Sequence, residues 1–245
     1  MLKFKYFGAY IIPLFGFYTF SVNGIFAYSG LIFLYILVPF LECFLPPDTY
    51  NFTKIERNLG KKDPFYDWIL YFSVVLHVCV VFRFISVISN AELEIFDRVA
   101  YVLMMGTILG VNGINIGHEL GHKTAHRLKT LLAHIMLFTS LQNHFIIYHN
   151  GGHHRDVATP LDYTSAKEGT IFYWFAIRSQ IGGYFKTWQL EAARLKLQGK
   201  SPFLNKMILF TLMPVSLIFC LYFFLGSEVS FYYFIAAVYG ISILE

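Results

Sequence analysis

Six apolar stretches constrain this chain more than any other feature, because each approaches the length needed to cross a lipid bilayer. They are Tyr6–Ser21, Ile25–Leu45, Phe65–Ser89, Phe96–Gly117, Met207–Leu225 and Val229–Leu244. Only 14% of the residues are charged, whereas soluble domains carry about a quarter. A transmembrane helix needs about 20 apolar residues, so the sequence predicts an all-α integral membrane helical bundle with about six transmembrane helices. We expect residues 1–245 to form a single membrane domain.

Polar residues within the apolar sequence call for separate interpretation. The stretch Leu131–Tyr148 is apolar but interrupted, so we interpret it as a buried or half-inserted helix. Arg83 lies near the outer end of the third stretch, where its long side chain can reach the interface. The three cysteines are single and lie within apolar runs, so we expect small buried side chains at Cys43, Cys79 and Cys220.

The basic residues are distributed unevenly between the loops. They gather at the N-terminus, in the loop after the second stretch and in the long segment from Lys123 to Lys206. The alternate loops 22–24, 90–95 and 226–228 contain no Lys or Arg. Loops rich in Lys and Arg face the cytoplasm, so we expect a cytoplasmic N-terminus and insertion in a bacterial inner (plasma) membrane. The net charge of +4 is too small and scattered to indicate nucleic-acid binding.

Two histidine clusters indicate a metal site on the cytoplasmic side. His118 and His122 in HELGHK are four residues apart, so on a helix their imidazoles lie on one face. His149 and His153 in HNGGHH repeat this spacing, and His154 adds a donor in a neighbouring direction. Imidazole is the commonest metal ligand in proteins. We therefore predict that all five histidines are metal ligands.

The other histidines have simpler interpretations. A lone histidine in an apolar helix is usually a satisfied core residue, which is our interpretation of His77 and His134. His126 stands beside basic residues, and we expect it to be solvated. His144 lies close to the second cluster and could orient a ligand. The pair Gly151-Gly152 predicts a close approach of the backbone to a neighbouring element or to the metal site.

These motifs resemble those of a known family. His118–Lys123 as HELGHK and His149–Asp162 as HNGGHHRDVATPLD are similar to the membrane-bound alkane 1-monooxygenases. These belong to the histidine-box superfamily of membrane desaturases and hydroxylases. The resemblance continues through Trp188–Glu191, where the family has a similar Trp-x-Leu-Glu. Tyr148 departs from the pattern, because the family commonly has Glu at this place.

The resemblance implies a di-iron centre that activates O2 and hydroxylates the terminal C–H bond of an alkane to a primary alcohol. Electrons would come from NAD(P)H through a reductase and rubredoxin. The five clustered histidines would bind iron, and Glu119, His144, Arg155 and Asp156 would hold them in position. Lys123 and Arg155 could contact an acidic electron carrier, although the positive-inside pattern explains their placement equally well. The implied partners are rubredoxin, alkane and membrane lipid, with no nucleic acid.

The family carries two further histidine boxes, shaped like NYxEHYG and LQRHxxHH, whereas this sequence stops at Glu245 within an apolar run. We therefore expect an incomplete chain that lacks the third and fourth boxes. We expect this polypeptide alone to bind metal weakly and to be inactive. Robust hydroxylation of octane by the purified chain, supplied with rubredoxin and reductase, would contradict this expectation.

Other functions fit parts of the pattern. HELGH also fits the HExxH motif of a zinc protease, with Glu119 as general base and Asp162 as the third ligand. That interpretation leaves the second histidine cluster without a role. Another histidine-box lipid desaturase or hydroxylase shares the boxes but is not expected to share the GHHRDVATP run. An inactive remnant whose histidines no longer act is the non-enzymatic alternative.

Overall fold

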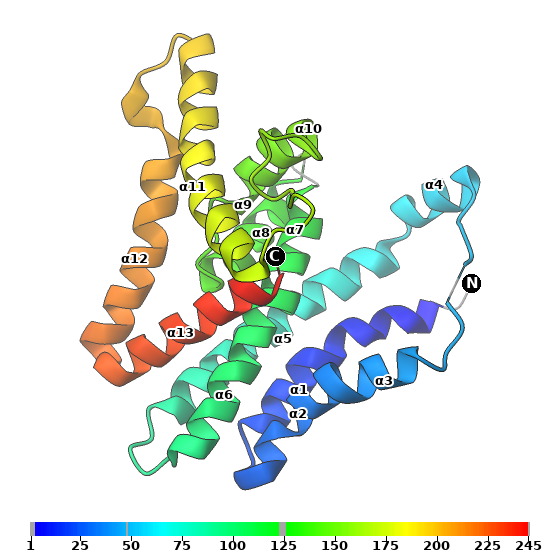
Figure 1. Cartoon of the computed structure of the whole chain (residues 1–245), viewed down its shortest axis with the longest axis vertical. Helices are drawn as coiled ribbons and strands as arrows, with labels where there is room; N and C mark the ends of the chain where they lie inside the picture. Colours follow the sequence, from blue (N-terminus) through cyan, green and yellow to red (C-terminus); the bar gives the residue numbers. More distant parts are fainter. Residues whose placement is uncertain (1–2, 48, 123–125, 245) are drawn as a thin grey trace.

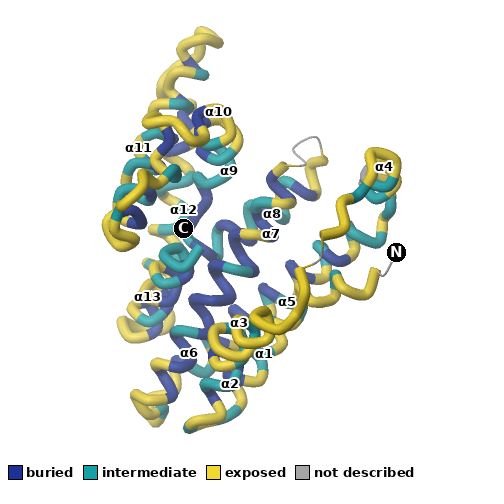
Figure 2. Tube along the Cα trace, turned by 45° about the vertical axis from the view of Figure 1, so that its right-hand side comes forward, coloured by how far each residue is buried: buried dark blue, intermediate teal, exposed yellow. Residues whose placement is uncertain are grey.

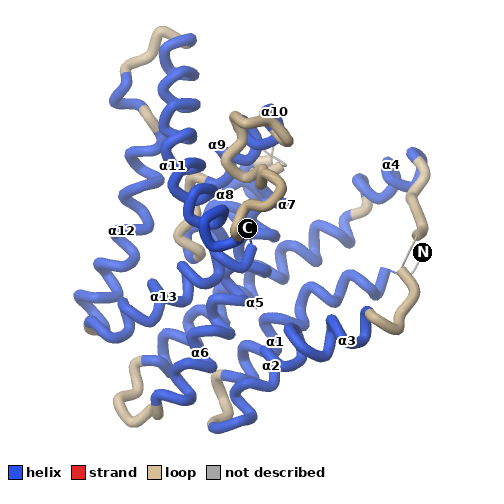
Figure 3. Tube along the Cα trace, viewed as in Figure 1, coloured by secondary structure: helices blue, strands red, loops and turns tan. Residues whose placement is uncertain are grey.

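The computed structural model describes residues 3–47, 49–122 and 126–244, with the side chains of Arg57 and Lys61 left aside. Within these ranges all regular secondary structure is helical (Figure 3). The prediction of an all-α bundle is therefore confirmed. Lys123 and Glu245, which the sequence analysis singled out, lie outside the described residues.

The N-terminal part of the chain forms an outer group of helices and then a long inner one (Figure 1). The elements are η1 (Lys3–Tyr10), α1 (Ile11–Thr19), η2 (Gly24–Tyr28), α2 (Ser29–Ile32), η3 (Phe33–Leu37), α3 (Val38–Glu42), α4 (Lys54–Lys62) and α5 (Pro64–Ile88). Local signals explain two of the helix starts. Thr53 and Glu56 form a reciprocal capping box at α4. The Asp63 side chain accepts from the Phe65 N–H at the start of α5, where Pro64 is the first helical residue.

The remaining elements build the centre and the far side of the molecule. They are α6 (Ile95–Thr107), η4 (Ile108–Ile114), α7 (Asn115–Gly121), α8 (Arg127–Thr139), α9 (Phe145–Tyr148), η5 (His149–His153), α10 (His154–Asp156), α11 (Phe172–Leu197), η6 (Pro202–Leu204), α12 (Lys206–Leu225) and α13 (Ser227–Leu244). The segments η3, η4 and η5 are π-helical. The interrupted stretch Leu131–Tyr148 forms two helices rather than one: the later part of α8, which ends at Thr139, and the short helix α9.

Five helices in the described part of the chain are long and apolar enough to cross a membrane. They are Gly24–Glu42, Pro64–Ile88, Ile95–Gly121, Lys206–Leu225 and Ser227–Leu244. The sequence predicted about six, and the first of those stretches, Tyr6–Ser21, instead folds into the shorter pair η1 and α1. In the helix 95–121, 78% of the residues in its most apolar window are buried, whereas in α12 only 6% are. Figure 2 accordingly shows much of the α6–α7 helix as buried and α3 and α4 as mostly exposed.

The three loops without Lys or Arg lie toward the same end of the bundle, in the lower part of Figure 1. The buried Asp97 carboxylate accepts from the Gly24 N–H at 2.6 Å. The Arg98 guanidinium donates to Glu228 at 2.9 Å and to the Asn90 carbonyl at 3.0 Å. These contacts tie the loops without Lys or Arg to the start of α6 at this end of the bundle.

Two expectations about residues in the apolar stretches have different outcomes. Arg83 donates to the Phe20 carbonyl at 2.8 Å at this same end, and its reach to the membrane interface stays a prediction. The expectation of buried cysteines is wrong, because Cys43, Cys79 and Cys220 are all exposed. In a membrane helix an apolar residue can face lipid as readily as protein, so apolar surroundings in the sequence do not imply burial.

Helix α13 packs on the central helix through glycines. A Cβ atom on Gly110 would lie 2.3 Å from the Gly240 carbonyl oxygen, and one on Gly240 would lie 2.3 Å from the Gly106 carbonyl oxygen. Small residues permit such backbone contact between membrane helices, where packing replaces the hydrophobic effect as the source of association. This crossing brings Ile241 and Leu244 to the cavity described below.

Replacement of this contact should weaken the bundle. We expect Gly240→Leu to force α13 away from α6 and η4 and to reduce the free energy of unfolding by about 1–3 kcal/mol, the usual range for overpacking. Val238→Leu, on a position that is 43% exposed, is the matched control and should change little. Thermal unfolding in detergent measures both variants. Equal midpoints for the two would contradict the glycine contact.

Candidate metal centre

The first two histidines lie at the end of the buried central helix, where α7 ends. His118 lies in its last turn and His122 directly follows it. Their Nε2 atoms are 2.6 Å apart, so both rings point to one place. Two imidazole nitrogens at this distance must share a proton or a cation, because two lone pairs or two N–H groups would repel each other. The predicted same-face pair is therefore present.

The second cluster differs from its predicted geometry. His149–His153 is a π-helical turn, in which bonding from residue i to i+5 widens the helix. The ring centroids of His149 and His154 are 4.4 Å apart, whereas those of His149 and His153 are 5.3 Å apart. The rings of His149 and His153 still stack on each other, but the wider turn places the His154 ring closer to His149 than the His153 ring is.

Four imidazoles converge across the gap between α7 and η5. One ring nitrogen each from His118, His122, His149 and His154 can be chosen so that all four lie within 4.8 Å of one another. His153 stands beside this group of four rather than within it. Similar π-helical turns occur often at functional sites.

The environment of His149 fits a bound metal ion. Its Nε2 atom is buried and has no hydrogen-bond partner among the described residues. A buried ring nitrogen without a partner costs free energy, and coordination would remove that cost. Burial, with the neighbouring His118 and His154 rings, lowers the pKa of His149 to about 3, so its imidazole is neutral and keeps a lone pair at physiological pH. All-imidazole ligands suit iron, as well as zinc, copper and nickel.

His153 is held by Asp162 rather than by the four converging rings. Its Nδ1 atom lies 2.9 Å from the Asp162 carboxylate, to which the Tyr148 hydroxyl also donates at 2.8 Å. Burial opposes ionisation of Asp162, but hydrogen bonds from Ser165, Thr164, Tyr148 and His153 outweigh it and hold the pKa of the carboxyl well below its ordinary value. The zinc-protease interpretation needed Asp162 as a ligand. The Asp162 carboxylate is instead hydrogen-bonded to Tyr148 and His153. In addition, His149 and His154 converge with the two histidines of HELGH.

The charged residues that the sequence places near the ligands differ in their burial and in their partners. Arg155 and Asp156 bind each other through two hydrogen bonds of 2.7 Å, and this pairing lowers the pKa of Asp156. Lys186 adds a longer contact to Asp156 at 3.9 Å. Glu119 is exposed on α7 between the two histidines. Lys123 lies outside the described residues.

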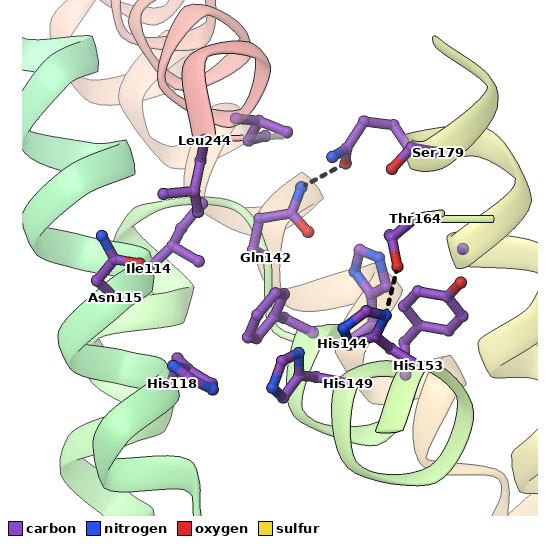
Figure 4. A pocket seen from close by; sticks show the side chains of 15 residues that line it. Ile114, Asn115, His118, Gln142, His144, His149, His153, Thr164, Ser179 and Leu244 are labelled. Carbon is purple, nitrogen blue, oxygen red and sulfur yellow. Dashed lines mark hydrogen bonds between the residues drawn. The ribbon is translucent and has the colours of Figure 1, made fainter. Parts of the chain in front are cut away.

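A cavity of about 310 Å³ adjoins the histidines. Figure 4 shows His118 and His149 at one side of it, with Ile114 and Leu244 at the other. Ile241 of α13 and Phe145 of α9 add to the apolar part of the lining. The cavity therefore joins polar ring nitrogens to an apolar space formed by the central helix and α13.

Polar residues on two other elements also line this cavity. The Gln142 side chain donates to Gln180 of α11 at 3.2 Å, as Figure 4 shows. His144 lines the cavity and packs against Tyr184, with their ring centroids 5.3 Å apart. Burial lowers the pKa of His144 to about 4. The sequence alone indicates no role for Gln142 or Gln180. They come from separate segments, so no local motif could have indicated their proximity.

The structure agrees with the sequence-based interpretation for two of the three remaining histidines. His77 is fully buried, with Nδ1 3.2 Å from the Asn112 side chain and Nε2 2.9 Å from the Thr139 hydroxyl. His126 is exposed, as expected. His134 is only partly buried, and its Nδ1 has no hydrogen-bond partner among the described residues. It is therefore not a satisfied core histidine.

Residues 98–245, which include the central helix, both histidine clusters and α13, match the model of the fatty acid desaturase family. The chain therefore belongs to the fatty acid desaturase family, whose members of the histidine-box type were already indicated by the motifs. The all-α fold, the apolar helices and the converging imidazoles agree with this membership.

Within this family the chain is similar to alkane 1-monooxygenases. It is 33% identical over 191 residues to alkane 1-monooxygenase 1 of Alcanivorax borkumensis, which covers 77% of this chain and 47% of the relative. It is 33% identical over 186 residues to alkane 1-monooxygenase of Acinetobacter baylyi, covering 75% and 45%. The corresponding protein of Pseudomonas putida is 31% identical over 191 residues, covering 77% and 47%. The chain thus spans about half the length of the curated relatives it matches.

The two adjacent glycines of η5 provide a matched test of the site geometry. A Cβ on Gly152 would lie 2.9 Å from the Tyr148 ring, whereas one on Gly151 would first meet Leu190 at 4.0 Å. We expect Gly152→Ala to displace Tyr148, with a lower thermal midpoint and weaker metal binding. Gly151→Ala gains the same helix propensity and should leave both unchanged. Identical metal titrations for the two variants would contradict the close packing at Gly152.

Proposed function

We propose that this chain forms the iron site of a membrane-bound alkane monooxygenase. His118, His122, His149 and His154 would bind iron, with His153 as a fifth ligand in a di-iron centre. The observation that carries the proposal is the convergence of four imidazoles from two separate segments, 118–122 and 149–154, beside an apolar cavity. The similarity to alkane 1-monooxygenases supports alkane as the substrate class.

Iron held by these imidazoles would supply the activation of O2. The residues of the chain have other tasks in this proposal. The neutral His149 ring offers its buried nitrogen as a ligand, and the hydrogen bond to Asp162 holds the His153 ring. Ile114, Ile241 and Leu244 provide an apolar space that would exclude water and receive a hydrocarbon chain. The resemblance to the family supports terminal C–H hydroxylation to a primary alcohol.

We further propose that electrons reach the site from the cytoplasm, from NAD(P)H through a reductase and rubredoxin. The motifs lie at the opposite end of the bundle from the loops without Lys or Arg, which supports a cytoplasmic position in a bacterial inner membrane. Arg155, with a side chain 58% exposed, is a basic group next to the cluster. Such a group would attract an acidic carrier.

Production of 1-octanol from octane tests this function. The reading frame that contains this sequence would be expressed in a host that supplies rubredoxin and its reductase. We expect His149→Ala to reduce 1-octanol to background, because it removes a ligand. His126→Ala removes an exposed histidine outside the cluster and should retain the activity.

The proposal would be abandoned if the unaltered protein accumulates in the membrane and forms no alcohol, or if the two histidine variants are equally active. Immunoblots of the membrane fraction verify that every variant is inserted to the same level.

A further inference from the structure

The loop between α10 and α11 places one carboxylate against the second histidine cluster. Asp162 is 1% exposed. Its Oδ2 atom accepts from Ser165 at 2.6 Å and lies 2.9 Å from His153 Nδ1. Its Oδ1 atom accepts from the Tyr148 hydroxyl at 2.8 Å and from the Thr164 N–H at 3.1 Å. A buried carboxylate with this many donors is held in its ionised form.

The hydrogen-bond directions around Asp162 determine which nitrogen of His153 carries a proton. The Tyr148 hydroxyl accepts from the Tyr163 N–H at 3.0 Å, so its own proton goes to Asp162. The Thr164 hydroxyl lies 2.8 Å from Asp162 Oδ1 and 2.8 Å from His153 Nδ1. Because Thr164 gives its proton to the carboxylate, its lone pair faces the ring. Both neighbours of His153 Nδ1 are therefore acceptors, and Nδ1 must carry the proton.

We propose that Asp162 is a positioning residue, which holds His153 in the tautomer that leaves Nε2 free to bind metal and fixes the orientation of its ring. This inference rests on the proposed metal site. Ligating histidines generally donate their second N–H to a carboxylate or carbonyl, which fixes the tautomer and raises the basicity of the ligand. Asp162 is the last residue of the HNGGHHRDVATPLD run, eight residues beyond the histidine cluster itself, and it lies in a loop.

Tyr148 connects Asp162 to the helices, because its ring packs between η5 and α11. Its ring packs against Gly152, where a Cβ would lie 2.9 Å away, and against Gly183 of α11, where a Cβ would lie 3.4 Å away. Its hydroxyl therefore meets Asp162 from a fixed direction. Burial and the bond to Asp162 raise the pKa of Tyr148 to about 12, so the hydroxyl remains a donor at physiological pH.

Titration with Co²⁺, followed by its visible absorption bands, tests the role of Asp162 in the purified full-length protein in detergent. We expect the unaltered protein to show bands that His149→Ala abolishes. Asp162→Asn keeps the shape of the side chain but loses the charge, and it should weaken Co²⁺ binding about 10- to 100-fold and shift the bands. Asp97→Asn removes another buried carboxylate at the far end of the bundle and should match the unaltered protein.

A second variant protects the test against misfolding of Asp162→Asn. Thr164→Val is nearly isosteric and removes the hydroxyl between Asp162 and His153, so it should cause a smaller loss of affinity with a band shift in the same direction. Bands absent from the unaltered protein would refute the metal site itself. The positioning role alone would be overturned if His149→Ala abolishes the bands but Asp162→Asn leaves their position and the Co²⁺ affinity unchanged. If Asp162→Asn does not fold, the same result in Thr164→Val would overturn it.

Discussion

The close packing of α13 on the glycines of α6 and η4 places the helix that carries His118 and His122. Without Cβ atoms at Gly106, Gly110 and Gly240, the two backbones come into direct contact. Between apolar helices in lipid, this contact provides the packing energy that the hydrophobic effect supplies in water. The same crossing brings the end of α13 to the cavity. A helix–helix contact thus determines both where the first ligands lie and what forms the apolar wall beside them.

The π-helical turn at His149–His153 is the second structural feature on which the site depends. An ordinary α-helix would place His149 and His153 on one face. The wider turn places His149 and His154 together, towards His118 and His122. It also turns His153 to the loop, where Asp162 receives its Nδ1–H. One local change in helical geometry therefore divides the five clustered histidines between a converging group of four and one ring held by a carboxylate.

Much of this arrangement follows from the sequence because it depends on local periodicity. The stretches Phe65–Ser89 and Met207–Leu225 became helices Pro64–Ile88 and Lys206–Leu225, since long apolar runs leave few other structures possible in a membrane. The facing of His118 and His122 follows from α-helical spacing. The HELGHK and HNGGHHRDVATPLD motifs also indicated the family that the comparisons support.

What the sequence did not predict depends on contacts between distant segments. No spacing of apolar residues indicates the π-helical turn, next to which the Tyr148 ring packs against Gly152 and Gly183. The exposure of the cysteines depends on which helix face meets lipid. The role of Asp162 requires a loop to fold back on η5, and its motif position alone suggested a zinc ligand in a different enzyme.

The central claim is that histidines from α7 and η5 bind one metal centre, and iron K-edge X-ray absorption tests it most directly. The purified full-length protein, loaded with Fe²⁺, should give an inner shell dominated by nitrogen, with the multiple scattering of imidazole rings. His118→Ala and His149→Ala should each reduce that imidazole signal. A shell made of oxygen alone, or one that neither substitution changes, would contradict the account.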